Sequence, residues 1–187
     1  MNLYLFGGSF DPPHLGHNEI IKYFLDKSDI FLISPSYYSP FKEKKPKVSY
    51  SDRKIMLELM LEIELCSKVS ILDYEFNNKS IFSVDTIKYL KTKYPNYDIN
   101  MIVGLDQYNE IEKWKEYEYI LDRVNLKVIS RPGTPNNVKK YSGEFIEDIF
   151  MDVSSSYIRN NMHDINKIQS LLDQSVFKYI TQNKLYI

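Results

Sequence analysis

The sequence predicts an α/β fold, a Rossmann-like doubly wound sheet that is mainly parallel and carries helices on both faces. Short apolar runs alternate with longer segments whose apolar residues recur at helical spacing. Unusual polar residues cluster directly after the ends of several predicted strands. Alternating strands and helices build βαβ units, whose right-handed crossovers place ligands at the carboxyl ends of the strands. The 187 residues suit one domain, which we expect to span 1–187.

The strands are predicted from apolar runs that turn residues interrupt. Gly7-Gly8 should stop the first run, Ser34-Pro35 the second and Gly104 the fourth. Arg131-Pro132-Gly133 should close the fifth. In chain order, the six predicted strands are residues 3–6, 30–33, 69–72, 99–103, 126–129 and 145–151.

The helices are predicted from periodicity and capping residues. The first covers 15–25, and a Pro- and Lys-rich loop over 36–48 precedes the second, which Ser49 or Ser51 can cap. The apolar stripe of that second helix is Ile55, Met56, Leu59, Met60 and Ile63. Ser83 can cap a third helix through Ile87 and Leu90. Two short helical stretches surround Trp114, and a serine-initiated helix and two short helices follow the last strand.

Composition excludes several classes of protein. A net charge of −1 gives no general attraction to nucleic acid or to an anionic membrane. No apolar run approaches the roughly 20 residues that span a bilayer, and residues 1–6 lack the features of a signal peptide. The single cysteine, Cys66, excludes an internal disulfide and suits a reducing compartment. We therefore expect a cytoplasmic protein without nucleic-acid or membrane partners, and we leave homo-oligomer formation open.

The first motif is Gly-Gly-Ser-Phe-Asp-Pro-Pro-His-Leu-Gly-His, residues 7–17, which follows the first strand and opens the first helix. Gly7 and Gly8 let the backbone approach a ligand closely, and the helix start favours an anion. His14 and His17 are three residues apart, so both imidazoles can face a phosphate there. Either histidine alone would more simply be incidental. A metal site lacks a third ligand at suitable spacing, and no Gly-Lys-Ser/Thr follows as in a Walker loop.

The second motif, Val-Ser-Ser-Ser-Tyr-Ile-Arg at 153–159, follows the last strand. Its three serines, Ser154, Ser155 and Ser156, can cap a helix and offer hydroxyl and N–H groups to a phosphate chain. Arg159 adds a permanent charge on a planar fork that fits phosphate oxygens. Taken alone, this segment would be an ordinary capped helix with a surface arginine.

Together the two motifs resemble the signatures of the His-x-Gly-His nucleotidyltransferase superfamily, and the first is most similar to bacterial nicotinate mononucleotide adenylyltransferases. The resemblance implies His14, His17 and Arg159 as catalytic residues. Cytidylyltransferases carry a different second segment, and phosphopantetheine adenylyltransferases usually lack the Ile-Arg ending. The ATP-binding residues that it implies are Gly7, Gly8, Ser9, Phe10, Gly104, Asp106, Ser154, Ser155, Ser156 and Ile158.

The resemblance also implies a site for the nicotinate nucleotide, formed by Lys42, Phe82, Ser83, Trp114, Lys115 and Arg131. Two segments depart from the family pattern. Ser-Pro-Phe-Lys at 39–42 replaces Pro-Pro-His-Lys, and Ile-Phe-Ser-Val-Asp-Thr at 81–86 replaces Ser-Tyr-Thr-x-x-Thr. Backbone N–H groups of Phe82 and Ser83 can still hold a carboxylate, so the preference between acid and amide stays open.

The implied reaction joins the phosphate of nicotinate mononucleotide to the α-phosphate of ATP and releases pyrophosphate. A phosphate monoester is largely dianionic at neutral pH, so it needs no general base. Catalysis should come from positioning and charge neutralisation, with Mg²⁺ bridging phosphate oxygens and few or no protein ligands. The alternatives are the same chemistry on nicotinamide mononucleotide or phosphopantetheine, and a nucleotide-binding module without activity.

Overall fold

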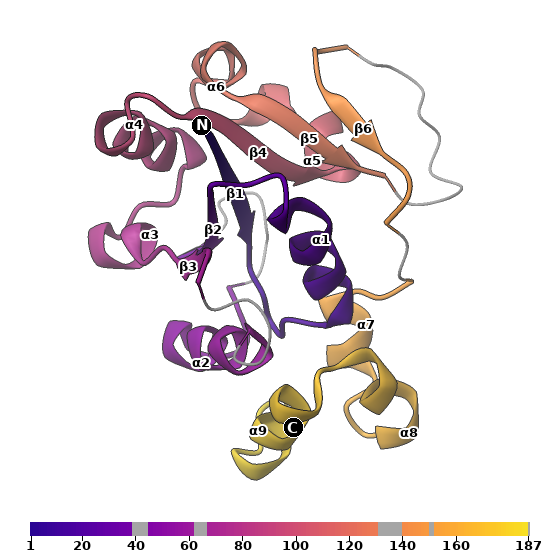
Figure 1. Ribbon diagram of the computed structural model, residues 1–187. Coiled ribbons are helices and arrows are strands. Elements are labelled where there is room, and N and C mark those ends of the chain that lie inside the picture. The colour runs from indigo at the N-terminus through magenta and orange to yellow at the C-terminus, as the bar shows by residue number, and fades with distance from the viewer. Residues whose placement is uncertain (39–44, 62–66, 131–139, 150–151, 187) are drawn as a thin grey trace.

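A parallel sheet forms the centre of the molecule. The computed structural model describes residues 1–38, 45–61, 67–130, 140–149 and 152–186. Within these ranges six strands pair in the order β3-β2-β1-β4-β5-β6, and every pairing is parallel (Figure 1). The predicted doubly wound α/β class is therefore confirmed. The strands are β1 (Asn2–Gly8), β2 (Ile30–Pro35), β3 (Val69–Ile71), β4 (Asp98–Gly104), β5 (Asn125–Ile129) and β6 (Glu144–Ile146).

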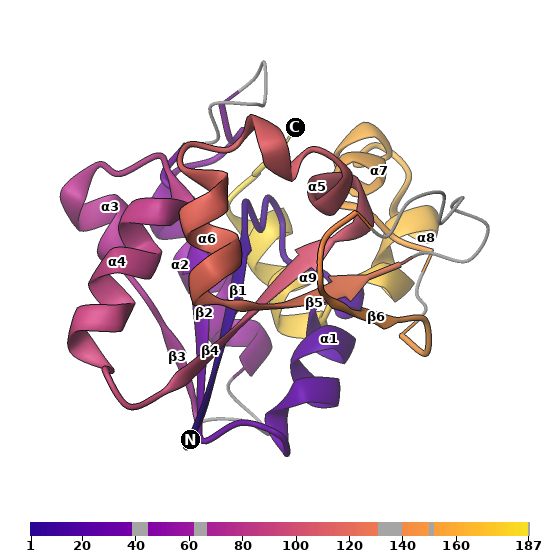
Figure 2. The ribbon, with the colours of Figure 1, turned by 90° about the horizontal axis from the view of Figure 1, so that it is seen from above.

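Helices cover both faces of this sheet, as Figures 1 and 2 show from two directions. None of the helices in the described residues is long and apolar enough to cross a membrane. The helices are α1 (Leu15–Leu25), α2 (Tyr50–Leu61), α3 (Tyr74–Asn78), α4 (Ser83–Lys93), α5 (Leu105–Asn109), the 3-10 helix η1 (Ile111–Lys113), α6 (Tyr117–Arg123), α7 (Ser155–Asn160), α8 (Ile165–Ile168), η2 (Gln169–Leu171) and α9 (Gln174–Gln182).

The core consists of two clusters, one on each face. Helices α1, α2, α7, α8 and α9 contribute to the first cluster, and α4, α5 and α6 contribute to the second. Alternate residues of β1 enter opposite clusters: Tyr4 and Phe6 join the first, and Leu3 and Leu5 join the second. Burial on both faces explains why the strand sequences are almost continuously apolar.

The strand order reverses beside β1. The chain moves outward from β1 to β2 and β3, and then returns to place β4 against the other edge of β1. Ligands of doubly wound folds bind at such a switch point, outside the carboxyl ends of the strands. Gly8 ends β1 and Gly104 ends β4, so the two segments with predicted ligand contacts emerge at this position.

Several predicted boundaries differ from the structure. The sixth strand was predicted over 145–151, but β6 ends at Ile146, which pairs with Ile129, the last residue of β5. Residues 147–149 are not strand, and 150–151 lie outside the described residues. Strand β1 continues through both glycines because β2 extends beside them to Pro35.

Helix starts and stripes also differ in detail. Ser49 caps α2, since its hydroxyl oxygen accepts the Asp52 N–H at 3.1 Å. Ser83 does not cap α4: Phe82 occupies the N-cap position and Ser83 is the first helical residue. Ile55, predicted in the apolar stripe of α2, is exposed. Ile63 lies outside the described residues, and the short helix α3 had no predicted counterpart.

Candidate active site

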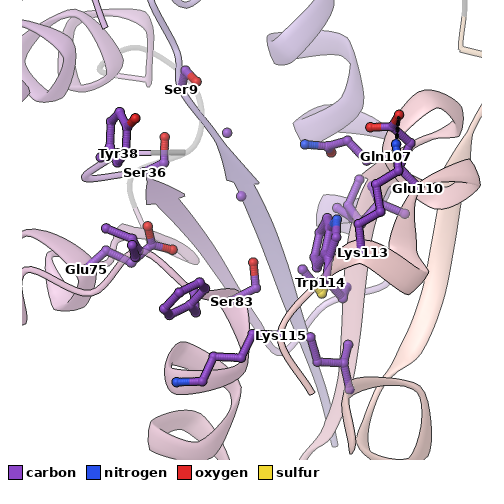
Figure 3. A pocket seen from close by; sticks show the side chains of 18 of the residues that line it. Ser9, Ser36, Tyr38, Glu75, Ser83, Gln107, Glu110, Lys113, Trp114 and Lys115 are labelled. Carbon is purple, nitrogen blue, oxygen red and sulfur yellow. Dashed lines mark hydrogen bonds and ion pairs between the residues drawn. The ribbon is translucent and has the colours of Figure 1, made fainter. Parts of the chain in front are cut away.

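A cavity of about 310 Å³ lies at the switch point (Figure 3). Gly7, Gly8 and Ser9 line it from the end of β1, and Asp106 lines it from α5 after β4. The structure therefore brings four of the predicted ATP-binding residues to one edge of the sheet. Gly104 is the N-cap of α5 and does not itself line the cavity.

Four of the predicted nicotinate-nucleotide residues line the same cavity: Phe82, Ser83, Trp114 and Lys115. Figure 3 shows the Ser83 hydroxyl and the Trp114 ring on opposite sides of the hollow. The Lys115 ammonium lies over the Phe82 ring, 4.6 Å from its centroid, and so points away from the middle of the cavity. Lys42 and Arg131 lie outside the described residues. Their predicted roles stay predictions.

The loop after β1 has an unusual backbone at Phe10. Its φ of 48° lies in the left-handed region, which is costly for a bulky residue and frequent at functional sites. The ring is 1% exposed and packs edge-on against Phe6 and His17. A Cβ at Gly8 would lie 3.1 Å from this ring, so a side chain there would force the ring to shift by a few tenths of an ångström. The buried ring leaves only the backbone of Phe10 for a ligand.

The two histidines lie together at the start of α1, as their spacing predicted. His14 is the N-cap of the helix, and the two imidazole rings stack with centroids 3.7 Å apart. The backbone N–H of His14 donates to Nδ1 of His17 at 3.1 Å. Because Nδ1 of His17 accepts this bond, its ring proton is on Nε2, where it can be donated to an anion.

The second motif packs directly on the first. The Ser155 hydroxyl donates to the carbonyl of Pro12 at 2.8 Å, and Nη1 of Arg159 donates to the carbonyl of Asp11. Gly16 lies at the same contact, since a Cβ there would be 2.9 Å from Cγ1 of Val153 and 3.1 Å from Nδ1 of His14. Segments about 140 residues apart in sequence thus form one structure.

The serines of the second motif have different partners. The hydroxyl oxygen of Ser154 accepts the Tyr157 N–H at 3.1 Å and caps α7, as predicted. Ser156 accepts from Nη2 of Arg159 at 3.0 Å. The Ile158 side chain is fully buried in the first core cluster, and its assignment to the ATP site stays a prediction. What remains for a phosphate chain is the guanidinium and the polar groups of the serines.

Four residues that had no predicted role lie in or beside the site: Asp11, Arg53, Glu75 and Tyr186. Arg53 comes from α2, is 1% exposed, and donates from Nη1 to the carbonyl of Ser9 at 2.6 Å. Burial lowers the pKa of Arg53, and the Asp11 carboxylate is the chief opposing influence. The signal in the sequence is a charged residue three positions before Met56, on the apolar face of its helix.

Glu75, from α3, lines the cavity as a buried carboxyl group. Burial raises the pKa of Glu75 to about 7. Donors to the carboxylate oppose this shift: the Tyr37 N–H at 3.3 Å and the hydroxyls of Thr86 at 3.4 Å and Ser34 at 3.5 Å. The Glu75 carboxyl group therefore titrates near neutral pH in the wall of this cavity.

The raised pKa of Glu75 predicts a pH-dependent stability. Between about pH 4.5 and pH 7 the folded chain keeps a proton that the unfolded chain releases, so the free energy of unfolding should fall as pH rises. Glu75→Gln should lack this fall in the free energy of unfolding. Between about pH 4.5 and pH 7 the wild type should therefore lose about 1–3 kcal/mol more stability than the variant. Urea unfolding at several pH values measures it. Glu58→Gln, which changes an exposed glutamate of α2, is the control, and parallel curves for wild type and Glu75→Gln would contradict the prediction.

The model of the cytidylyltransferase-like family matches residues 5–161, a range that contains both motifs and the cavity. The chain belongs to this family. Two curated relatives cover 81% and 97% of it. The chain is 40% identical over 169 residues to a probable nicotinate-nucleotide adenylyltransferase of Aquifex aeolicus, covering 81% of this chain and 98% of the relative. It is 33% identical over 193 residues to one of Leptospira interrogans, covering 97% and 95%.

Solved structures show the same fold for this member of the cytidylyltransferase-like family. A nicotinic acid mononucleotide adenylyltransferase of Plasmodium falciparum, complexed with NaAD, superposes with a TM-score of 0.87 at 22% identity over 99% of this chain and 97% of that one. A putative nicotinate-nucleotide adenylyltransferase of Vibrio parahaemolyticus gives a TM-score of 0.72 at 22% identity over 97% and 99%.

Proposed function

We propose that this chain transfers the adenylyl group of ATP to nicotinate mononucleotide, giving nicotinate adenine dinucleotide and pyrophosphate in NAD biosynthesis. The observation that carries the proposal is the direct contact of the two motifs beside a cavity lined by Ser83 and Trp114. The names of the relatives with 33–40% identity support the same substrate. The stacked histidines and Arg159 supply the donors that a triphosphate needs.

The reaction forms one bond and breaks one. An oxygen of the acceptor phosphate attacks the α-phosphorus of ATP, and the bond from that phosphorus to the β-phosphate bridging oxygen breaks. The electron pair leaves with pyrophosphate. Since the attacking oxygen is already anionic near neutral pH, no side chain has to remove a proton. The protein has to bring two anions together and stabilise the charge that builds up.

Each part of the site has an assigned role in this proposal. The backbone of Gly8, Ser9 and Phe10 and the Nε2–H of His17 contact the α-phosphate, and His14 brackets the triphosphate. Arg159 and the serines of the second motif hold the β- and γ-phosphates and stabilise departing pyrophosphate. Asp106 lies beside the sugar and the phosphates of the bound nucleotide.

The pyridine ring of the acceptor lies against Trp114, since a flat aromatic ring offers a stacking surface. The carboxylate of the nicotinate ring accepts hydrogen bonds from backbone N–H groups near Phe82 and Ser83. Lys115 lies beside these two residues. Lys42 and Arg131 are proposed to bind the phosphate of the acceptor.

Magnesium enters the proposal with ATP. The part of the chain that the structure describes has no group of three or more His, Cys, Asp or Glu side chains that could hold a metal ion. Mg²⁺ commonly keeps water and phosphate oxygens as ligands, so no protein ligand is assigned to it here. When bound, it neutralises phosphate charge. A cytoplasmic location and a homo-oligomer stay predictions.

The test is pyrophosphate release from ATP and Mg²⁺ with three candidate acceptors, and without an acceptor, side by side. We expect turnover with nicotinate mononucleotide, weaker turnover with nicotinamide mononucleotide, and none with phosphopantetheine or without an acceptor. Preference for phosphopantetheine would overturn the acceptor assignment. ATP binding without pyrophosphate release in the presence of any acceptor would support a module that has lost its activity.

A further inference from the structure

Asp11 lies at the centre of the first motif's loop and joins three segments of the chain. It is 4% exposed. Its Oδ1 accepts the hydroxyl of Tyr186 at 2.9 Å, and its Oδ2 accepts the N–H of Lys47 at 2.8 Å. Its backbone carbonyl accepts Nη1 of Arg159, whose Nη1 is also 3.8 Å from Oδ2. The side chain and the backbone of one residue therefore fix both the loop and the arginine.

Tyr186 reaches Asp11 from the segment after α9, through an unusual backbone. Lys184 and Tyr186 have φ values of 51° and 66°, in the left-handed region that non-glycine residues seldom adopt. Such conformations persist where surrounding contacts over-determine them. The contacts here are the hydrogen bond to Asp11 and packing of Leu185 and Tyr186 on the first core cluster.

The phenol of Tyr186 acts as a fixed donor. Burial and, next, the Asp11 carboxylate raise the pKa of Tyr186, so its hydroxyl stays protonated through the range of an enzyme assay. One oxygen of Asp11 therefore always has a side-chain donor. Charged acceptors make the stronger hydrogen bonds, and a buried carboxylate that loses a donor is costly.

The other side-chain hydrogen-bond donors to this loop act on its backbone, and the Lys47 N–H is the backbone donor to Asp11. Arg53 holds the carbonyl of Ser9, Arg159 that of Asp11, and Ser155 that of Pro12. Tyr186 differs from these because its hydroxyl binds the side chain of Asp11. Loss of its hydroxyl would let the Asp11 carboxylate turn and change the position of the Arg159 guanidinium.

We propose that Tyr186 is a positioning residue for adenylyl transfer, which holds the first motif's loop and Arg159 through Asp11 in the geometry that the ATP phosphates require. The proposal rests on the proposed function for its reaction, and on the contacts of Asp11 for its mechanism. Tyr186 itself is assigned no contact with substrate.

The structure offers a matched control in the same part of the chain. The Tyr179 hydroxyl donates to Oδ1 of Asp52 at 3.0 Å and ties α9 to α2. Tyr179→Phe therefore removes the same kind of bond from the same region without touching the loop. We expect Tyr186→Phe to lower kcat about tenfold, the usual effect of one charged hydrogen bond, and Tyr179→Phe to leave kcat within about twofold. The KM for the acceptor should not change in either variant.

Three further measurements separate a positioning role from a general loss of stability. In an Asp11→Ala background, Tyr186→Phe should cause no further loss of kcat, because its partner is gone. Titration calorimetry with ATP and Mg²⁺ alone should show several-fold weaker binding for Tyr186→Phe and unchanged binding for Tyr179→Phe. Thermal unfolding shows whether the two variants lose similar stability.

The outcomes distinguish the two proposals. Equal kcat and equal ATP affinity in Tyr186→Phe and Tyr179→Phe would overturn the role of Tyr186. So would a full additional loss of kcat in the Asp11→Ala background. Absence of turnover with nicotinate mononucleotide in the wild type would overturn the proposed function instead, and the ATP affinities would still decide the role of Tyr186.

Discussion

Replacing His17 by alanine is expected to lower kcat for adenylyl transfer about a hundred- to a thousandfold, the usual cost of one pre-organised donor in a transition state. His17 is assigned this role because the N–H of His14 donates to its Nδ1 at 3.1 Å, which leaves the proton on Nε2. The ring is also held from two sides, by stacking on His14 and by the edge contact with Phe10. Pyrophosphate release under saturating substrates measures the effect.

The third histidine of the chain provides the control. His163 is exposed and lies outside both motifs, so His163→Ala should keep wild-type kcat. Thermal unfolding of His17→Ala is needed as well, because the imidazole packs on Phe6 and Phe10. A folded His17→Ala variant with kcat within a few-fold of wild type would remove His17 from the catalytic assignment.

The fold could be predicted because buried parallel strands leave a clear pattern. All six predicted strands correspond to strands of the sheet, since each is an apolar run bounded by turn residues. The errors occur where a boundary depends on a neighbour. Strand β6 ends at Ile146 because its partner β5 ends at Ile129, and the sequence around 147–151 contains no information about that partner.

The residues of the site also divide into those that local sequence predicts and those that depend on distant partners. His14 and His17 could be predicted to lie together, because three residues on a helix fix their relation. Tyr186 could not be found from its own surroundings, and the place of Arg53 on the apolar face of α2 does not reveal its partner. Tyr186 is 175 residues from Asp11, and Arg53 is 44 residues from Ser9, so only the folded chain brings these pairs together. Glu75 owes its raised pKa to burial, which a short helix absent from the predicted elements provides.

Replacing Arg159 by alanine is expected to lower kcat/KM for ATP about a hundredfold. The departing pyrophosphate would lose its contacts with the charged, planar guanidinium of Arg159. The structure shows the fork already oriented, with Nη1 on the carbonyl of Asp11 and Nη2 on Ser156 at 3.0 Å. Arg159→Lys keeps the charge but cannot make both contacts, so we expect a loss of about tenfold. Steady-state kinetics with ATP varied at saturating acceptor measures both.

The two Arg159 variants separate charge from structure because the same guanidinium also holds the loop. If Arg159 only stabilised the loop, kcat/KM would fall in proportion to thermal stability in both variants. Arg159→Lys would then restore neither kcat/KM nor the melting temperature. If Arg159 neutralises phosphate charge, kcat/KM of Arg159→Lys should be about tenfold above that of Arg159→Ala, even where the melting temperatures of the two variants are close. Arg123→Ala, which removes an exposed arginine of α6 beside Asp122, controls for loss of net charge and should match wild type. Wild-type kcat/KM in a folded Arg159→Ala variant would contradict the assignment of the second motif to the phosphates.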